Sequence, residues 1–172
     1  MMKRVILCIG LLALLPVLGV FLAPATAQEA PNDDKLGLVS YWLDRGNMAL
    51  ESDALDQARM AYERAMLADP RQSATHANLG RAHLAMGNGT AAAKYLRTAL
   101  DIDPQNLDAL HWAGLVDLLG DDVEAAKKRR DKLLTLCSSN CQQYRALSKA
   151  VKNYADAKLE EEAAALSASS DK

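Results

Sequence analysis

The sequence has 172 residues, of which 50% are hydrophobic, 24% charged and 5% aromatic. This length predicts one short domain together with a targeting segment, and the low counts of glycine and proline exclude collagen-like and low-complexity chains. The 22 acidic residues balance the 20 basic ones, leaving a formal charge of -2. The chain therefore lacks the basic surplus of nucleic-acid-binding proteins, and we expect no nucleic-acid partner.

The first 27 residues have the features of a secretory signal peptide. Two basic residues precede an apolar run from Val5 to Ala23, and Ala25 and Ala27 then form an A-x-A cleavage site. Cleavage there predicts a periplasmic or secreted protein with no integral membrane span after processing. The alternative is a retained anchor, because the apolar run is nearly long enough to cross a bilayer. Polar residues 28–35 follow as a predicted linker.

A period of 34 residues runs through the middle of the chain. Gly46, Gly80 and Gly114 follow it, and Pro70 and Pro104 repeat the same interval. The same period relates three alanines, which are Ala58, Ala92 and Ala126. Glycine inside a helix costs about 1 kcal/mol relative to alanine. The recurring glycines therefore predict points where a second helix passes too close for a side chain.

This pattern resembles the tetratricopeptide repeat, a unit of two helices that often closes with proline. The three units cover residues 39–72, 73–106 and 107–139. The second unit matches the family best, and it carries Leu79, Gly80, Ala92, Leu96, Ala99 and Pro104 at the family's marked positions. The resemblance implies an all-α, right-handed α-solenoid of about three helix-turn-helix repeats within a domain at residues 36–157.

The third unit departs from the pattern towards its end. Gly120 and Asp121 arrive one residue early, Asp117 replaces the usual aromatic residue, and no proline closes the unit. In each unit a short polar residue precedes the second helix, and Asp53, Thr90 and Asp121 are the expected N-caps.

An amphipathic helix follows the third unit. Tyr144, Leu147, Val151 and Tyr154 recur at helical spacing on one face. A solenoid needs such a helix at its end, so residues 140–157 are predicted as a capping helix. The stripe is lost in residues 158–172, which are predicted to be frayed or disordered.

Cys137 and Cys141 are the only cysteines that remain after the signal segment. In an oxidising compartment an even pair favours a disulfide, which would join the third unit to the capping helix. A redox pair is the alternative. The CxxxC spacing differs from the CxxC of thioredoxin-like sites, which also lie between a strand and a helix.

The first helices of each unit line a concave groove in the family. The resemblance therefore implies a groove for a protein or peptide partner formed by Leu43, Asn47, Asn78, Arg81, Leu84, His111, Trp112 and Leu115. Chaperone adaptors of the family bind a terminal carboxylate with two asparagines and three basic residues. Asn47 and Asn78 match the asparagines, but Leu43, Asp108 and Trp112 occupy the basic positions, which argues against this clamp. Trp112 is either an apolar anchor of the groove or a core residue.

No motif for catalysis, nucleotide binding or metal binding occurs. His76 and His83 are seven residues apart, about 10 Å along a helix, which is too far to share one metal. We expect no catalytic residue, no metal and no cofactor. The sequence predicts an exported, non-enzymatic protein–protein interaction module, a scaffold or adaptor, and the resemblance favours the bacterial envelope. The alternatives are a structural subunit of a membrane-associated envelope assembly and a thiol redox helper using Cys137 and Cys141.

Overall fold

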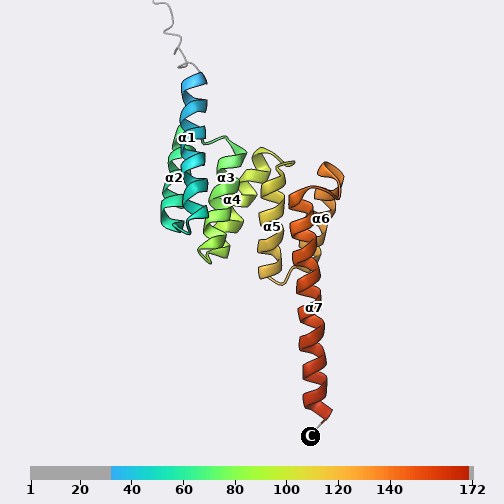
Figure 1. Cartoon of the computed structure of the whole chain (residues 1–172). Coiled ribbons are helices and arrows are strands. Elements are labelled where there is room, and N and C mark those ends of the chain that lie inside the picture. Colours follow the sequence, from blue (N-terminus) through green and yellow to red (C-terminus); the bar gives the residue numbers. More distant parts are fainter. Residues whose placement is uncertain (1–31, 171–172) are drawn as a thin grey trace, which may run out of the picture.

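The computed structural model describes residues 32–170. Every regular element in this range is a helix, and the seven helices are α1 (Asn32–Glu51), α2 (Leu55–Ala68), α3 (Ser73–Ala85), α4 (Gly89–Ile102), α5 (Leu107–Leu119), α6 (Val123–Cys137) and α7 (Gln142–Ser170) (Figure 1). The predicted signal peptide and the first part of the predicted linker lie outside the described residues. None of the described helices is long and apolar enough to cross a membrane.

The helices form three successive pairs, which stack side by side (Figure 1). Helix α1 packs on α2, α3 on α4, and α5 on α6, and each pair also contacts the next one. Helix α7 closes the stack against α5 and α6. The predicted all-α solenoid of helix pairs with a terminal capping helix is confirmed.

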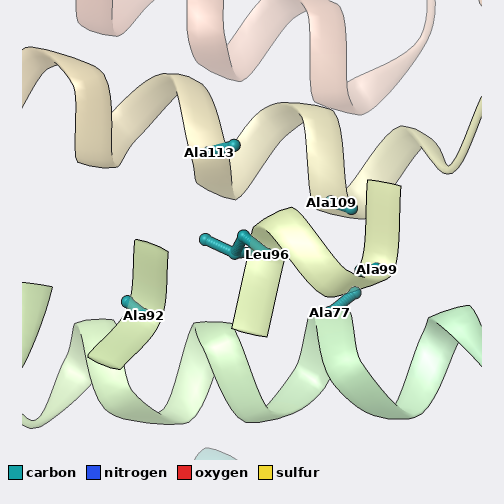
Figure 2. Packing of buried hydrophobic residues seen from close by; sticks show 6 residues of the cluster. All are labelled: Ala77, Ala92, Leu96, Ala99, Ala109 and Ala113. Atoms are coloured by element: carbon teal, nitrogen blue, oxygen red, sulfur yellow. The ribbon is translucent and has the colours of Figure 1, made fainter. Parts of the chain in front are cut away.

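Small side chains fill the contacts between neighbouring pairs. The central cluster combines Leu96 with alanines from α3, α4 and α5 (Figure 2). Ala58, Ala92 and Ala126, which follow the 34-residue period, are all fully buried. Alanine allows helix axes to approach closely and has the best helix propensity. The repeating alanines therefore set the spacing between helices.

The recurring glycines lie at helix crossings, as predicted. A Cβ atom added at Gly80 would lie 2.5 Å from Cγ of Leu96, and one at Gly114 would lie 2.5 Å from Cδ2 of Leu147. A Cβ added at Gly46 would clash with the ring of Tyr62. At all three positions the neighbouring side chain occupies the space that any larger residue would need.

The turn inside each repeat contains one residue with a left-handed backbone. These residues are Asp53, Gly87 and Asp121, with φ angles of 57°, 75° and 60°, and they also follow the 34-residue period. Aspartate adopts this conformation more readily than most residues that carry a side chain. In the third repeat the left-handed residue is therefore Asp121 and not its neighbour Gly120.

This turn geometry makes the predicted N-caps wrong. Asp53 and Asp121 lie two residues before their helices begin, and Thr90 lies inside α4. The side chain that caps α6 belongs to Asp122, whose carboxylate accepts the Ala125 N–H at 2.9 Å. Aspartate at the left-handed position moves the helix start, and hence the cap, one residue further along the chain.

The two ends of the helical domain differ from the sequence prediction. Helix α1 begins at Asn32, inside the predicted linker at 28–35. Helix α7 continues to Ser170, through the tail predicted to be frayed, and projects beyond the other helices (Figure 1). Alanine, glutamate, leucine and lysine dominate residues 158–166 and have high helix propensity. Their helix therefore forms without the apolar stripe that the prediction required.

Candidate functional site

A hollow of about 300 Å³ opens where the first helices of repeats 2 and 3 meet the start of α7. Its lining combines one cationic, one anionic and several uncharged polar side chains around one indole, and the residues are Asn78, Arg81, Asp108, His111, Trp112, Gln142 and Gln143. The 34-residue period brings α3 and α5 together here, because Asn78 and Trp112 occupy equivalent positions of their repeats.

The centre of the hollow is a stack of side chains on Trp112. The guanidinium carbon of Arg81 lies 5.3 Å from the centre of the indole ring, within the range of a cation–π contact. The imidazole of His111 lies 4.4 Å from the same ring. Trp112 is half-buried, and it also packs against the central core cluster. The indole therefore contributes to the core and leaves part of its surface in the hollow.

Arg81 brings a positive charge that no carboxylate neutralises among the ion pairs of residues 32–170. A guanidinium has five N–H donors in a planar arrangement that matches a carboxylate. Asp108 is the anionic group of the hollow, and its Oδ1 accepts a hydrogen bond from Nε2 of Gln143 at 2.9 Å. The donors of Arg81 are therefore available to a ligand.

His111 is uncharged near neutral pH. Burial lowers the pKa of its imidazole, Asp108 raises that pKa, and Arg81 lowers it again. A neutral imidazole leaves Arg81 as the cation of the hollow. The site thus offers one fixed positive charge beside an apolar ring face.

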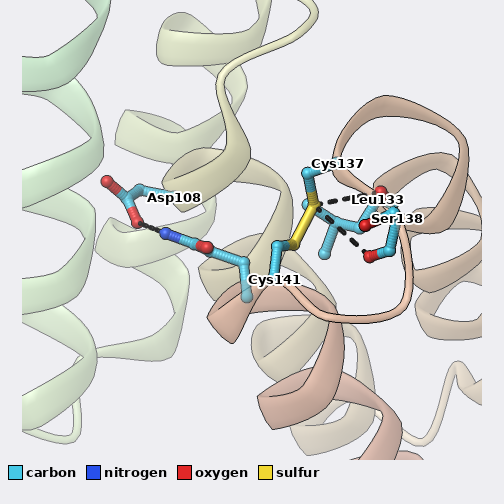
Figure 3. The surroundings of a disulfide bond; sticks show 6 residues. Asp108, Leu133, Cys137, Ser138 and Cys141 are labelled. Atoms are coloured by element: carbon cyan, nitrogen blue, oxygen red, sulfur yellow. Dashed lines mark hydrogen bonds between the residues drawn. A yellow bond between two sulfur atoms is a disulfide. The ribbon is translucent and has the colours of Figure 1, made fainter.

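The cysteine pair holds the start of α7 beside the hollow (Figure 3). The Cα atoms of Cys137 and Cys141 lie 5.8 Å apart and the pair is bonded, which is within the range for a disulfide. Sγ of Cys137 lies 3.2 Å from the carbonyl oxygen of Leu133 in α6. Gln142 and Gln143 follow Cys141 directly, so this bridge fixes where their amides enter the site.

The structure brings four of the eight predicted groove residues into one hollow: Asn78, Arg81, His111 and Trp112. Leu43, Leu84 and Leu115 are half-buried and pack against the three core clusters. Oδ1 of Asn47 accepts a hydrogen bond from the Tyr62 hydroxyl at 2.8 Å. These four residues therefore lie outside the lining of the hollow.

Gln142 and Gln143 are the site residues that sequence reasoning missed. The 34-residue period ends before α7, so no repeat position predicts which side chains of α7 face α5. The side chain of Gln143 reaches Asp108 across 35 residues of sequence. Only the three-dimensional packing of α7 places it in the site.

His76 and His83 of α3 make local contacts. The rings of His83 and Tyr95 stack 5.2 Å apart, and Nε2 of His76 hydrogen-bonds to the Pro70 carbonyl oxygen at 2.8 Å. Among the residues that the structure describes, no group of three His, Cys, Asp or Glu side chains is arranged to hold a metal.

Stacked pairs of helices define the class of helical repeat proteins. Residues 49–116 match the model of the tetratricopeptide repeat. The 34-residue period and the three helix pairs agree with this match, so the chain carries tetratricopeptide repeat units in this region. No curated protein matches the chain in sequence.

Solved tetratricopeptide repeat domains share the fold. The TPR2B domain of yeast Sti1, solved as a pHsp70 complex, is similar with a TM-score of 0.63 and 14% identity over 70% of this chain and 98% of that chain. The Arabidopsis OM64 TPR domain is similar with a TM-score of 0.62 and 18% identity, over 70% of this chain and 98% of that chain. The second TPR domain of human RPAP3 was solved in complex with the HSP70 peptide SGPTIEEVD. It is similar with a TM-score of 0.59 and 24% identity, over 69% of this chain and 98% of that chain.

Proposed function

We propose that this chain is an exported, non-enzymatic interaction module that binds an extended segment of a partner protein in the hollow around Trp112. The observation that carries the proposal is the cation on an aromatic ring: Arg81 lies over Trp112 and has no ion-pair partner among residues 32–170. Interface energy concentrates in tryptophan and arginine residues that are shielded from water. Support for a peptide ligand comes from the similar domains of Sti1 and RPAP3, which were solved with chaperone-derived partners.

The hollow favours a segment with an acidic side chain next to an apolar one. Arg81 would bind the carboxylate in a bidentate manner, and the apolar neighbour would cover the exposed part of the indole. Leu43, Asp108 and Trp112 stand at positions where terminal-carboxylate receptors carry basic residues. A free C-terminus is therefore not required, and an internal segment suits the site.

Export remains part of the proposal and rests on the first 27 residues. Cleavage after Ala27 would deliver the module to a periplasmic or extracellular space, and the Cys137–Cys141 bridge suits such an oxidising compartment. An intact mass that corresponds to a chain beginning at Gln28 would support export. A mass that retains residues 1–27, with the protein in the membrane pellet, would favour the anchored assembly subunit.

The binding proposal is tested with peptides selected from a random displayed library on the wild-type protein. Trp112→Ala and Arg81→Ala are each expected to weaken binding of the best peptide by about 2 kcal/mol, which is about thirtyfold, in titration calorimetry. Amidation of the peptide C-terminus is expected to leave the affinity unchanged. When the acidic residue of the peptide is replaced by its amide, Arg81→Ala should no longer weaken peptide binding.

Two control variants separate the groove from the fold. Leu67→Ala, at a side chain 82% exposed on α2, should change neither binding nor melting temperature. Gly80→Leu should damage folding first, because Leu96 occupies the space needed. A Trp112→Ala protein that melts like the wild type and binds every selected peptide with full affinity would contradict the proposal.

A further inference from the structure

The second half of α7 leaves the body of the protein. Leu147 and Val151 pack into the cluster formed with α5 and α6, and the described side chains from Ala155 to Glu162 are all exposed. The helix nevertheless continues to Ser170 (Figure 1). A lone helix of this length is marginal in water, so its second half would gain stability from a contact with another chain.

An apolar hollow of about 420 Å³ lies where α7 leaves the body. Val123 of α6 and Tyr154, Ala155 and Leu159 of α7 provide its apolar lining, and charged side chains complete its rim, which are Lys127, Lys158 and Glu162. The Tyr154 hydroxyl donates a hydrogen bond to Oδ1 of Asp121 at 2.5 Å, which fixes the ring at the edge of the hollow. Leu159 is 65% exposed although it borders this hollow, so the surface can accept an aliphatic side chain.

The charges of α7 are divided along its length. Arg145, Lys149 and Lys152 lie in the first half, whereas the second half carries one lysine, Lys158, beside the acidic residues Asp156, Glu160, Glu161 and Glu162. Two copies of such a helix attract each other in antiparallel orientation and repel each other in parallel orientation. The charge pattern therefore selects a second copy of the same chain with a defined direction.

We propose that the protein forms a two-fold symmetric dimer in which the α7 helices of two copies pack antiparallel. Lys152, Ala155, Leu159 and Glu162 are spaced by three and four residues, so they lie along one face of the helix. An axis centred between Ala155 and Leu159 inserts Leu159 of each copy into the apolar hollow of the other. The same register pairs Lys152 of each copy with Glu162 of the other, as a closed two-fold contact requires.

The Leu159 contact at the centre of the dimer lies away from the peptide hollow. Gln143 precedes Leu159 by sixteen residues, which is about 24 Å along the helix axis. Each dimer would carry two hollows, and a partner with two binding segments would gain from the effective concentration of the second site. This inference stands on α7 and the apolar hollow beside it and does not depend on which peptide binds around Trp112.

Sedimentation equilibrium of the full chain tests the dimer. The wild type is expected to show a reversible monomer–dimer equilibrium, and Leu159→Asp is expected to raise its dissociation constant by at least about tenfold. Leu67→Asp, a matched change at a more exposed leucine of α2, should leave the equilibrium unchanged. Circular dichroism establishes that both variants fold.

A charge exchange identifies the pairing directly. Lys152 and Glu162 of one chain are about 15 Å apart along the axis and cannot pair with each other. Glu162→Lys should weaken the dimer severalfold, and the double variant with Lys152→Glu should restore it. A wild type that stays monomeric over the accessible concentration range, a dimer insensitive to Leu159→Asp, or a double variant without restoration would each overturn the proposal.

Discussion

Repeats 2 and 3 use equivalent positions in different ways. Gly80 of α3 is in contact with Leu96, which lies on the second helix of the same repeat. Gly114 of α5 is in contact with Leu147, which lies on α7, outside the third repeat. The residue that corresponds to Leu96 in the third repeat is Arg130. The third repeat therefore takes its large apolar side chain from the capping helix.

A second pair of equivalent positions follows the same division. In repeat 2, His83 and Tyr95 form a ring stack. The residues 34 positions further on are Asp117 and Arg129, and they form an ion pair with Nε and Oδ2 2.5 Å apart. At these equivalent positions a ring stack joins the two helices of repeat 2, and an ion pair joins the two helices of repeat 3. The comparison shows that α7 is an integral part of the last repeat and not only a cover over it.

The largest expected effect comes from removing the side chain that α7 supplies. Leu147→Ala should lower the free energy of unfolding by about 3 kcal/mol, since Leu147 is fully buried against Gly114 and its loss leaves a cavity. Leu96→Ala should cost a similar amount in repeat 2. Chemical denaturation measures the loss of unfolding free energy in both variants. A loss below about 1 kcal/mol for Leu147→Ala would mean that α7 only covers the third repeat.

Reduction of the Cys137–Cys141 disulfide should have the next largest effect. The loop between the cysteines is short, so the chain-entropy model gives a loss on the order of 2 kcal/mol. Because the bridge holds α7 beside α5, the loss should appear as faster amide exchange in α5 to α7, with α1 to α4 unchanged. Thiol titration of the unfolded, unreduced protein should find no free thiol, and two reactive thiols would favour the redox alternative.

A smaller effect is expected from pH, and His83 of repeat 2 should contribute to it. Burial lowers the pKa of His83 below its usual value of 6.5, Arg59 lowers it further, and Glu63 raises it. The unfolded chain therefore binds the proton first as the pH falls. Stability should be fully present above about pH 6.5 and should decrease as the pH falls towards the lowered pKa.

The variant His83→Gln measures the contribution of this histidine. The decrease in unfolding free energy between pH 7.5 and pH 5.5 should be smaller in the variant than in the wild type, since glutamine does not titrate. Some decrease should remain, because burial also lowers the pKa of His111. An equal decrease in both proteins would show that His83 does not contribute to the pH dependence of stability.

Much of the fold could be predicted from the sequence, because one repeating unit encodes most of it. Gly80 and Ala92 predict a helix crossing and a close contact by their period alone, and both are buried as expected. The caps could not be predicted by the same rule, because Asp53 and Asp121 adopt a left-handed backbone where a polar residue also suits a cap. The length of α7 could not be predicted from an apolar stripe, because its second half lacks one and consists of residues with high helix propensity.

The site could be predicted only as far as the period extends. Family positions placed Asn78, Arg81, His111 and Trp112 on one surface, and the structure brings them together. The same positions also included Leu84 and Leu115, which pack inward because their neighbours in α4, α6 and α7 present apolar side chains. The contribution of Gln143 depends on a contact across 35 residues that no repeat encodes.

Fluorescence of Trp112 during peptide titration tests the central claim most directly. Trp42 and Trp112 are the two tryptophans of the sequence, so Trp42→Phe leaves Trp112 as the reporter of the hollow. Binding of a selected peptide should exclude water from the indole and shift its emission to shorter wavelength, saturating with the affinity measured by calorimetry. The same affinity with no change in Trp112 emission would show that peptides bind elsewhere and would contradict the account.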